Sequence, residues 1–181
     1  MTRKHGPWTI TESERKYRHK LIEVYEDQVI RANGTPGTYT SVRVKEGVSV
    51  LALDGDGFVY LAREFRYAIG RESLEVVSGA IDEGEAPADA ARRELREELG
   101  IEAVELTPLG KVDPMPSIID SPSNLFLARN LKFKESHQEG GESIETVKLK
   151  LAEAVRMALA GDIMHGSSCV VILRANDFLK R

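Results

Sequence analysis

The feature that most constrains the fold of this chain is a charged helical segment closed by a glycine. Residues 86–99 are rich in Ala, Leu, Glu and Arg, Pro87 suits a first helical turn, and Gly100 suits a helix end. Apolar residues recur in this segment at the spacing of one buried stripe: Ala91, Leu95 and Leu99. The sequence therefore predicts a helix that covers a core with one face and gathers charge on another.

Three carboxylates crowd the charged face of this helix. Glu94 and Glu98 lie one turn apart, and Glu97 is adjacent to them. Their mutual repulsion would weaken the helix unless a cation lies between them, and Mg²⁺ and Mn²⁺ prefer such oxygen ligands. Arg93 is placed to hold a carboxylate through bidentate hydrogen bonds. The alternative is a solvated face with i,i+4 ion pairs, which is the commoner meaning of such a run taken alone.

The segments around this helix predict a layered α/β fold. Strands are expected at residues 21–25, 28–31, 39–44, 48–53, 58–65, 102–106, 109–112, 124–128 and 145–150. A hairpin is expected around Glu26–Asp27, and the proline-rich stretch 113–122 is expected to be a long functional loop. Helices are expected at 151–159 and 168–179, the latter capped by Ser167 or Ser168. This order favours α/β/α layers around a mixed sheet.

Composition excludes several classes of protein. The chain has 181 residues, of which 41% are hydrophobic and 30% are charged, as in a globular domain with a small attached subdomain. A net charge of −4 argues against binding nucleic acid by phosphate neutralisation. Cys169 has no cysteine partner, and no stretch approaches the roughly 20 apolar residues of a membrane span. We expect a cytoplasmic protein without a membrane or nucleic-acid partner.

From Gly79 to Ile101 the chain resembles the Nudix box at every defined position. The matching residues are Gly79, Glu85, Arg93, Glu94, Glu97, Glu98 and Gly100. Because this many fixed positions rarely coincide by chance, the spacing outweighs the solvated-face interpretation. The resemblance implies the Nudix fold, a mixed sheet between helices. It also implies Mg²⁺-dependent hydrolysis of a nucleoside diphosphate linked to another moiety, with Mn²⁺ as a possible substitute.

The same resemblance implies roles for the box residues. Glu94 and Glu98 correspond to the main metal ligands, and the carbonyl of Ser78 corresponds to a further metal contact. Glu97 corresponds to a further ligand or an orienting carboxylate, and Glu97 and Arg93 are both candidate catalytic residues. Glu85 is expected to support the geometry of the loop, the helix and the metal site.

The residues before the box resemble the ADP-ribose and nucleotide-sugar pyrophosphatase branch of the family. Its Arg-Gln-aromatic-Arg and Leu-Glu-x-x-Ala-Gly segments correspond to residues 63–66 and 74–79, with Glu64 and Ser78 as departures. Arg63 and Arg66 take opposite faces of a strand, so one of them is expected in the site. We favour Arg66 for a phosphate contact; a solvated strand arginine is the alternative. Glu75 is expected to bind a ribose hydroxyl or a base, or to be structural.

Two later segments also bear on the substrate. Pro116 stands at the offset where ADP-ribose pyrophosphatases carry a proline, but the glycine and glutamate that often follow it are absent. This departure favours a broader nucleotide-sugar specificity. The acidic loop 138–145 corresponds to the segment that often supplies the general base, and Glu142 and Glu139 are both candidates. A loop with no catalytic role is the alternative.

The N-terminal segment 8–31 resembles the small subdomain that this branch exchanges in a homodimer. The predicted division is a β subdomain at 1–44, antiparallel, and a Nudix hydrolase domain at 45–181. In this branch the exchanged subdomain helps to build the base pocket of the partner. Tyr25 is therefore a candidate for stacking on the base, and a core tyrosine is the alternative.

These observations predict a nucleotide-sugar diphosphatase that acts as a homodimer. The expected substrates are ADP-ribose first, then ADP-glucose or sugars of the GDP-mannose type, cleaved to a nucleoside monophosphate and a sugar phosphate. One alternative is a Nudix enzyme for a dinucleoside polyphosphate, a nucleoside triphosphate or coenzyme A. The other is a non-catalytic domain that senses a nucleotide sugar, although such domains typically lose box carboxylates that this chain retains.

Overall fold

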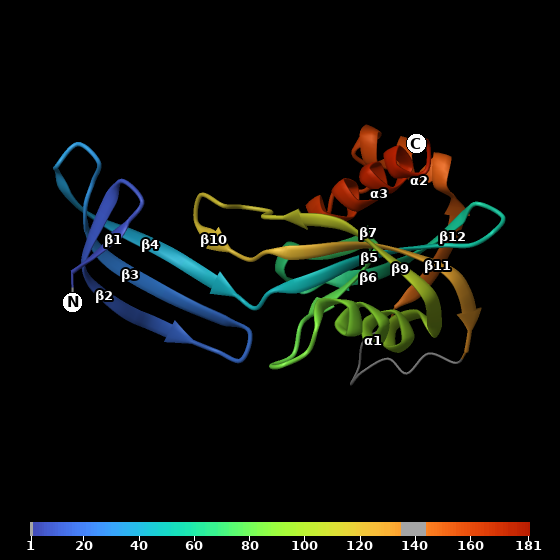
Figure 1. Ribbon diagram of the computed structural model, residues 1–181, viewed down its shortest axis with the longest axis horizontal. Helices are drawn as coiled ribbons and strands as arrows, with labels where there is room; N and C mark the ends of the chain where they lie inside the picture. The colour runs from blue at the N-terminus through green and yellow to red at the C-terminus, as the bar shows by residue number, and fades with distance from the viewer. Residues whose placement is uncertain (1, 135–143) are drawn as a thin grey trace. The chain divides into compact units, whose positions relative to one another are not determined.

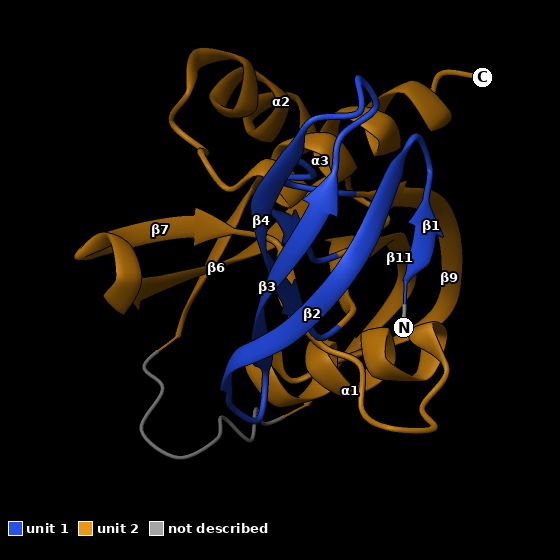
Figure 2. Ribbon diagram, turned by 90° about the vertical axis from the view of Figure 1, so that its left-hand side faces the viewer, with its two compact units in different colours: residues 1–45, 113–121 blue, residues 46–112, 122–181 orange. Residues whose placement is uncertain are grey.

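The computed structural model describes residues 2–134 and 144–181 (Figure 1). The chain forms two compact units, coloured separately in Figure 2. Unit 1 consists of residues 1–45 and 113–121, and unit 2 consists of residues 46–112 and 122–181. The stretch 113–121, expected as part of one long loop, therefore belongs to the same unit as the N-terminal strands.

Unit 1 is a mainly antiparallel sheet with the order β1-β2-β3-β4-β10. Its strands are β1 (Arg3–His5), β2 (Trp8–Arg18), β3 (Ile22–Ile30), β4 (Pro36–Val44) and β10 (Ile119–Asp120). The expected hairpin at Glu26–Asp27 is wrong, because β3 runs through these residues while pairing with both β2 and β4. No glycine follows Asp27, and a chain turn falls instead at Asn33–Gly34, where Gly34 has φ 83°.

Unit 2 is built on a seven-stranded mixed sheet with the order β12-β6-β5-β11-β9, in which β7 pairs with β6 and β8 pairs with β5. Its strands are β5 (Gly47–Leu53), β6 (Phe58–Arg66), β7 (Arg71–Glu75), β8 (Val77–Ala80), β9 (Ile101–Val112), β11 (Ser123–Phe133) and β12 (Glu145–Lys150). A 3₁₀ turn, η1 (Tyr67–Ile69), joins β6 to β7. The pairing of β5 with β11 is parallel, and the other pairings are antiparallel.

Helices cover both faces of this sheet. Figure 1 shows α1 (Pro87–Leu99) on one side, and α2 (Leu151–Ala160) and α3 (Gly166–Phe178) on the other. Strand β5 explains the layering, because Val48, Val50 and Ala52 pack in the cluster that includes α1, whereas Leu51 and Leu53 pack in the cluster that includes α2 and α3. A strand buried on both faces is apolar throughout, which is why the sequence reveals it. The expected α/β/α arrangement is present.

Two expectations about element ends are wrong. Residues 101–112 form one long strand, β9, rather than two, and Gly110, with φ 93°, lies within it. The N-cap of α3 is His165, because Ser167 and Ser168 are already buried in the first turn. The hydroxyl of Ser168 is engaged elsewhere, as described below. Among the described residues, no helix is long and apolar enough to span a membrane.

Candidate active site

The site begins where β8 passes under α1. A Cβ atom added at Gly79 would lie 2.0 Å from the carboxyl carbon of Glu94. Only a residue without a side chain therefore lets the Glu94 carboxylate approach the strand in its present position. Glu98, one turn further along α1, accepts a hydrogen bond from the backbone of Ser78. The glycine of the box thus brings two helix carboxylates against one strand.

Arg93 joins the remaining box carboxylates to the loop before the helix. Its guanidinium donates to both carboxylate oxygens of Glu85, at 3.0 and 2.9 Å, and to the Ala80 carbonyl at 2.9 Å. It also donates to Glu94 at 2.7 Å and to Glu97 at 3.1 Å. The predicted orienting role of Arg93 fits these contacts, and the expected support by Glu85 fits its pairing with Arg93.

Negative charge is nevertheless in excess at this end of α1. Burial raises the pKa of Glu98 to about 8, repulsion by Glu94 and Glu64 adds to the rise, and Arg66 opposes it. Burial also raises the pKa of Glu94, against the contact with Arg93. Perturbed carboxylates of this kind are typical of functional sites. A bound cation would offset both the cost of burying the two charges and the repulsion between them.

This donor set fits a divalent cation that the substrate helps to hold. Glu94 and Glu98 supply hard oxygen ligands, whereas Glu97 is paired with Arg93. In the described part of the chain, no three His, Cys, Asp or Glu side chains are grouped closely enough to hold an ion by themselves. Mg²⁺ commonly binds through one or two carboxylates, with substrate phosphate and water completing its shell. The carbonyl of Ser78 as a metal contact stays a prediction.

The two arginines of β6 have different surroundings. Arg66 forms a bidentate pair with Glu75, at 3.1 and 2.7 Å, and a further ion pair with Glu64. Its charge also acts on Glu98, so it belongs to the electrostatic surroundings of the α1 carboxylates. Arg63 pairs instead with Glu145 of the neighbouring strand β12, at 3.2 Å. The preference for Arg66 over Arg63 as a phosphate contact agrees with this difference and stays a prediction.

Four other predicted residues lie in unit 1 or outside the described residues. The Tyr25 hydroxyl donates to Glu23 at 2.8 Å, and the Arg43 guanidinium lies 4.5 Å from the centre of the Tyr25 ring. Pro116 lines a cleft of about 660 Å³ within unit 1, which Tyr25 does not line. The two general-base candidates, Glu139 and Glu142, lie outside the described residues.

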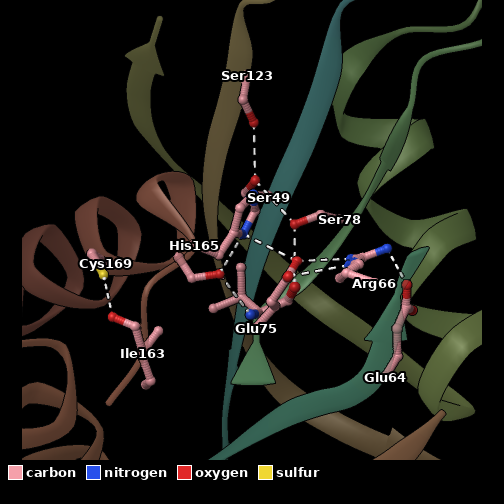
Figure 3. A network of polar contacts seen from close by, with 11 residues as sticks. Ser49, Glu64, Arg66, Glu75, Ser78, Ser123, Ile163, His165 and Cys169 are labelled. Atoms are coloured by element: carbon pink, nitrogen blue, oxygen red, sulfur yellow. Dashed lines mark hydrogen bonds and ion pairs between the residues drawn. The ribbon is translucent and has the colours of Figure 1, made fainter. Parts of the chain in front are cut away.

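The structure adds polar residues that sequence reasoning missed. The Ser49 hydroxyl lies 3.1 Å from that of Ser78 and 2.9 Å from that of Ser123 (Figure 3). On the other side, His165 and Ser168 contact the segment 75–76. The partners are separated by up to 92 residues, so no local pattern could have revealed them. The one signal was Ser49, a polar residue within an otherwise apolar strand.

Comparison with known proteins identifies the family. The family described as "NUDIX domain" matches residues 44–162, and the family described as "Nucleoside diphosphate sugar hydrolase N-terminal domain" matches residues 8–42. The chain therefore belongs to the Nudix family. The predicted enzyme class, a Nudix pyrophosphatase, is confirmed, as is the predicted Nudix fold.

Individual relatives extend over nearly the whole chain. The ADP-ribose pyrophosphatase of Bacillus subtilis is 27% identical over 161 residues, which cover 88% of this chain and 87% of that protein. The ADP compounds hydrolase NudE of Escherichia coli is 30% identical over 176 residues, covering 95% and 93%. A crystal structure of an ADP compounds hydrolase superposes with a TM-score of 0.84 at 27% identity, covering 96% and 94% of the two chains.

Proposed function

We propose that this chain hydrolyses the diphosphate bond of a nucleoside diphosphate sugar, with ADP-ribose as the favoured substrate, and that Mg²⁺ is required. The observation that carries the proposal is the crowding of two buried carboxyl groups, Glu94 and Glu98, against the strand at Ser78 and Gly79. Such a pair is costly to keep ionised until a cation binds. The names of the relatives, which refer to ADP-ribose and to ADP compounds, support the choice of substrate.

Individual residues have distinct roles in the proposed reaction. Glu94 and Glu98 would hold Mg²⁺, which when bound would neutralise charge on the diphosphate and promote ionisation of a water. Arg93 keeps Glu97 and Glu94 in place, and Arg66 contacts a phosphate oxygen. Oxygen of water bonds to one phosphorus, and the bond from that phosphorus to the bridging oxygen breaks. The proton of the water passes to Glu142 or Glu139, and the products are AMP and ribose phosphate.

A substrate panel tests this proposal. Purified protein is incubated with ADP-ribose, ADP-glucose, GDP-mannose, a diadenosine polyphosphate, ATP and coenzyme A, each with Mg²⁺, with Mn²⁺ or with EDTA. We expect release of AMP from ADP-ribose that stops in EDTA. Faster cleavage of ATP, the diadenosine compound or coenzyme A would contradict the substrate class. Binding of ADP-ribose without turnover would support the sensor alternative.

We propose that unit 1 binds the base of the substrate and that the protein acts as a homodimer. Its cleft includes an edge-to-face pair of Trp8 and Tyr39, with ring centres 5.7 Å apart, and Asp27. Asp27 lines this cleft, and its buried oxygen Oδ1 has no hydrogen-bond partner among the described residues, so the cleft retains an acceptor whose hydrogen-bonding capacity is unmet. Because Trp8 is the single tryptophan, quenching of its fluorescence by AMP tests base binding. Analytical ultracentrifugation tests the dimer, and a monomer without quenching would contradict this part of the proposal.

A further inference from the structure

A buried ion pair links Arg66 to the start of α3. Glu75 is only 5% exposed, and its carboxylate accepts the bidentate pair of hydrogen bonds from Arg66. The same carboxylate lies 3.3 Å from Nδ1 of His165, a residue 90 positions further along the chain (Figure 3). One oxygen of Glu75, Oε2, is thus shared between the arginine and the histidine.

The histidine ring is itself held in place. Its Nδ1 atom lies 2.8 Å from the hydroxyl oxygen of Ser168. That oxygen accepts the backbone N–H of Val76 at 2.9 Å, and Ser168 is fully buried. The ring of His165 is therefore fixed against the residue that follows Glu75 in the chain. With the proton on Nδ1, this N–H donates to the Ser168 oxygen, and the same atom lies 3.3 Å from Oε2 of Glu75.

The charges of the network favour an ionised carboxylate. Burial would raise the pKa of Glu75, but contacts with Arg66, His165 and Ser73 outweigh it and leave the pKa below its usual value. Burial lowers the pKa of His165, against the attraction of Glu75 and with the repulsion of Arg66. Burial thus favours the uncharged imidazole, and Arg66 is the main cationic partner of Glu75.

A purely local role for His165 does not account for these contacts. The residue is the N-cap of α3, yet its side chain forms no capping hydrogen bond with the helix backbone. Its ring nitrogen is directed instead to Glu75, the last residue of β7, and to Ser168. Arg66 has a second acidic partner in its own strand, Glu64. Glu75 holds two of the three guanidinium nitrogens and Glu64 pairs with the third, so a displaced Glu75 would change the orientation of Arg66.

We propose that His165 is a positioning residue, whose ring fixes Glu75 so that Glu75 presents Arg66 to a phosphate of the substrate. The inference rests on the proposed function, because that function supplies the phosphate. Arg66 would bind the phosphate in both the bound substrate and the transition state. Weakening this contact raises KM and changes kcat little, because the lost interaction stabilised both states equally.

Three substitutions of His165 test the role. The amide nitrogen of Asn reaches the position of Nδ1, whereas that of Gln reaches the position of Nε2. We expect His165→Ala and His165→Gln to raise KM for ADP-ribose about tenfold, with kcat within about threefold of wild type. His165→Asn should restore KM to near the wild-type value. If the alanine variant does not fold, the comparison of the asparagine and glutamine variants still decides.

A matched control comes from the same helix turn. The Cys169 thiol donates to the Ile163 carbonyl at 3.1 Å, so it ties α3 to the preceding loop without contacting Glu75 (Figure 3). Cys169→Ala should leave KM unchanged. In a Glu75→Gln background, His165→Ala should add no further rise in KM, because the histidine acts through the carboxylate.

The outcomes separate this inference from the proposed function. A wild-type protein that cleaves no nucleotide sugar overturns the proposed function. A wild-type protein that cleaves ADP-ribose, together with His165→Gln of unchanged KM, overturns only the role of His165. An equal rise of KM in Cys169→Ala, or additive effects of Glu75→Gln and His165→Ala, would also overturn it, since either result indicates a general disturbance of α3.

Discussion

Two carboxylates within unit 2 have opposite surroundings. Burial opposes ionisation of Asp54, in the turn between β5 and β6, yet hydrogen bonds from the Phe58 amide, the Tyr60 hydroxyl and Lys148 lower its pKa to about 2. Burial raises the pKa of Glu98, on α1, to about 8, and neighbouring carboxylates add to the rise. Donors outweigh burial at Asp54, whereas burial and neighbouring carboxylates outweigh the Ser78 and Arg66 contacts at Glu98.

This difference separates a structural carboxylate from a functional one. The folded-state pKa of Asp54 is lowered, so its contribution to stability is present above pH 3.8 and is lost as the pH falls through about 2. The folded-state pKa of Glu98 is raised, so its contribution is present below pH 4.5 and is lost as the pH rises through about 8. Near neutral pH the ionised Asp54 stabilises the fold, whereas ionisation of Glu98 is costly unless a cation is bound beside it.

The largest expected effect comes from Glu98→Gln. Removing the charge should lower turnover of ADP-ribose by about 100-fold or more, since even indirect partners of a metal site cost up to that factor. Without metal, the unfolding temperature at pH 8 should stay the same or rise, because a buried charge is lost. Asp89→Asn, at an exposed carboxylate on the same helix, is the control and should keep its activity. Normal turnover in Glu98→Gln would refute the functional half of the comparison.

Gly79→Ala should have the next largest effect. The new Cβ would lie 2.0 Å from the Glu94 carboxyl group, so that flexible side chain must move away from β8. We expect at least a tenfold loss of kcat with a stability change below about 1 kcal/mol, since only a side chain is displaced. Gly55→Ala is matched to it, because a Cβ there would meet no atom within 4 Å. Equal activity of both variants would show that the close approach at Gly79 is dispensable.

Asp54→Asn should change stability alone. The variant is expected to lose about 1 to 2 kcal/mol of unfolding free energy at pH 7, somewhat less than the full pKa shift implies because water reaches part of the turn. The loss should shrink as the pH falls from 3.8 toward 2, where the wild-type group becomes protonated. Urea titrations across this pH range measure it, and kcat for ADP-ribose should be unchanged. A loss of activity would remove the distinction between the two carboxylates.

The sequence predicted the layers well where periodicity is strong. The apolar run of β5 and the stripe of α1 follow from local spacing, and both are as expected. It failed at Glu26–Asp27, where polar residues imitate a turn although strands on both sides continue the pairing. It also failed at the start of α3, because Ser168 uses its hydroxyl for the distant Val76 amide rather than for a cap.

The same limit applies to the candidate site. The box residues lie within 23 positions of one another, so a single helix and its preceding loop bring them together. Arg66 and Glu75 were each predicted from the sequence as candidate site residues, but the ion pair between them was not. His165 was missed entirely, since only the packing of α3 on β5, β9 and β11 brings it to Glu75. Tertiary contacts of this length leave no local pattern.

The split composition of unit 1 has a consequence for how the protein can be shortened. The chain passes between the two units three times, near residues 45, 112 and 121. A deletion of the N-terminal strands would leave β10 attached to unit 2 without β4, its parallel partner. Likewise, a protease that cuts after residue 45 would not free unit 1, because residues 113–121 remain in the other fragment. Neither gene truncation nor a single cleavage can therefore remove unit 1 whole.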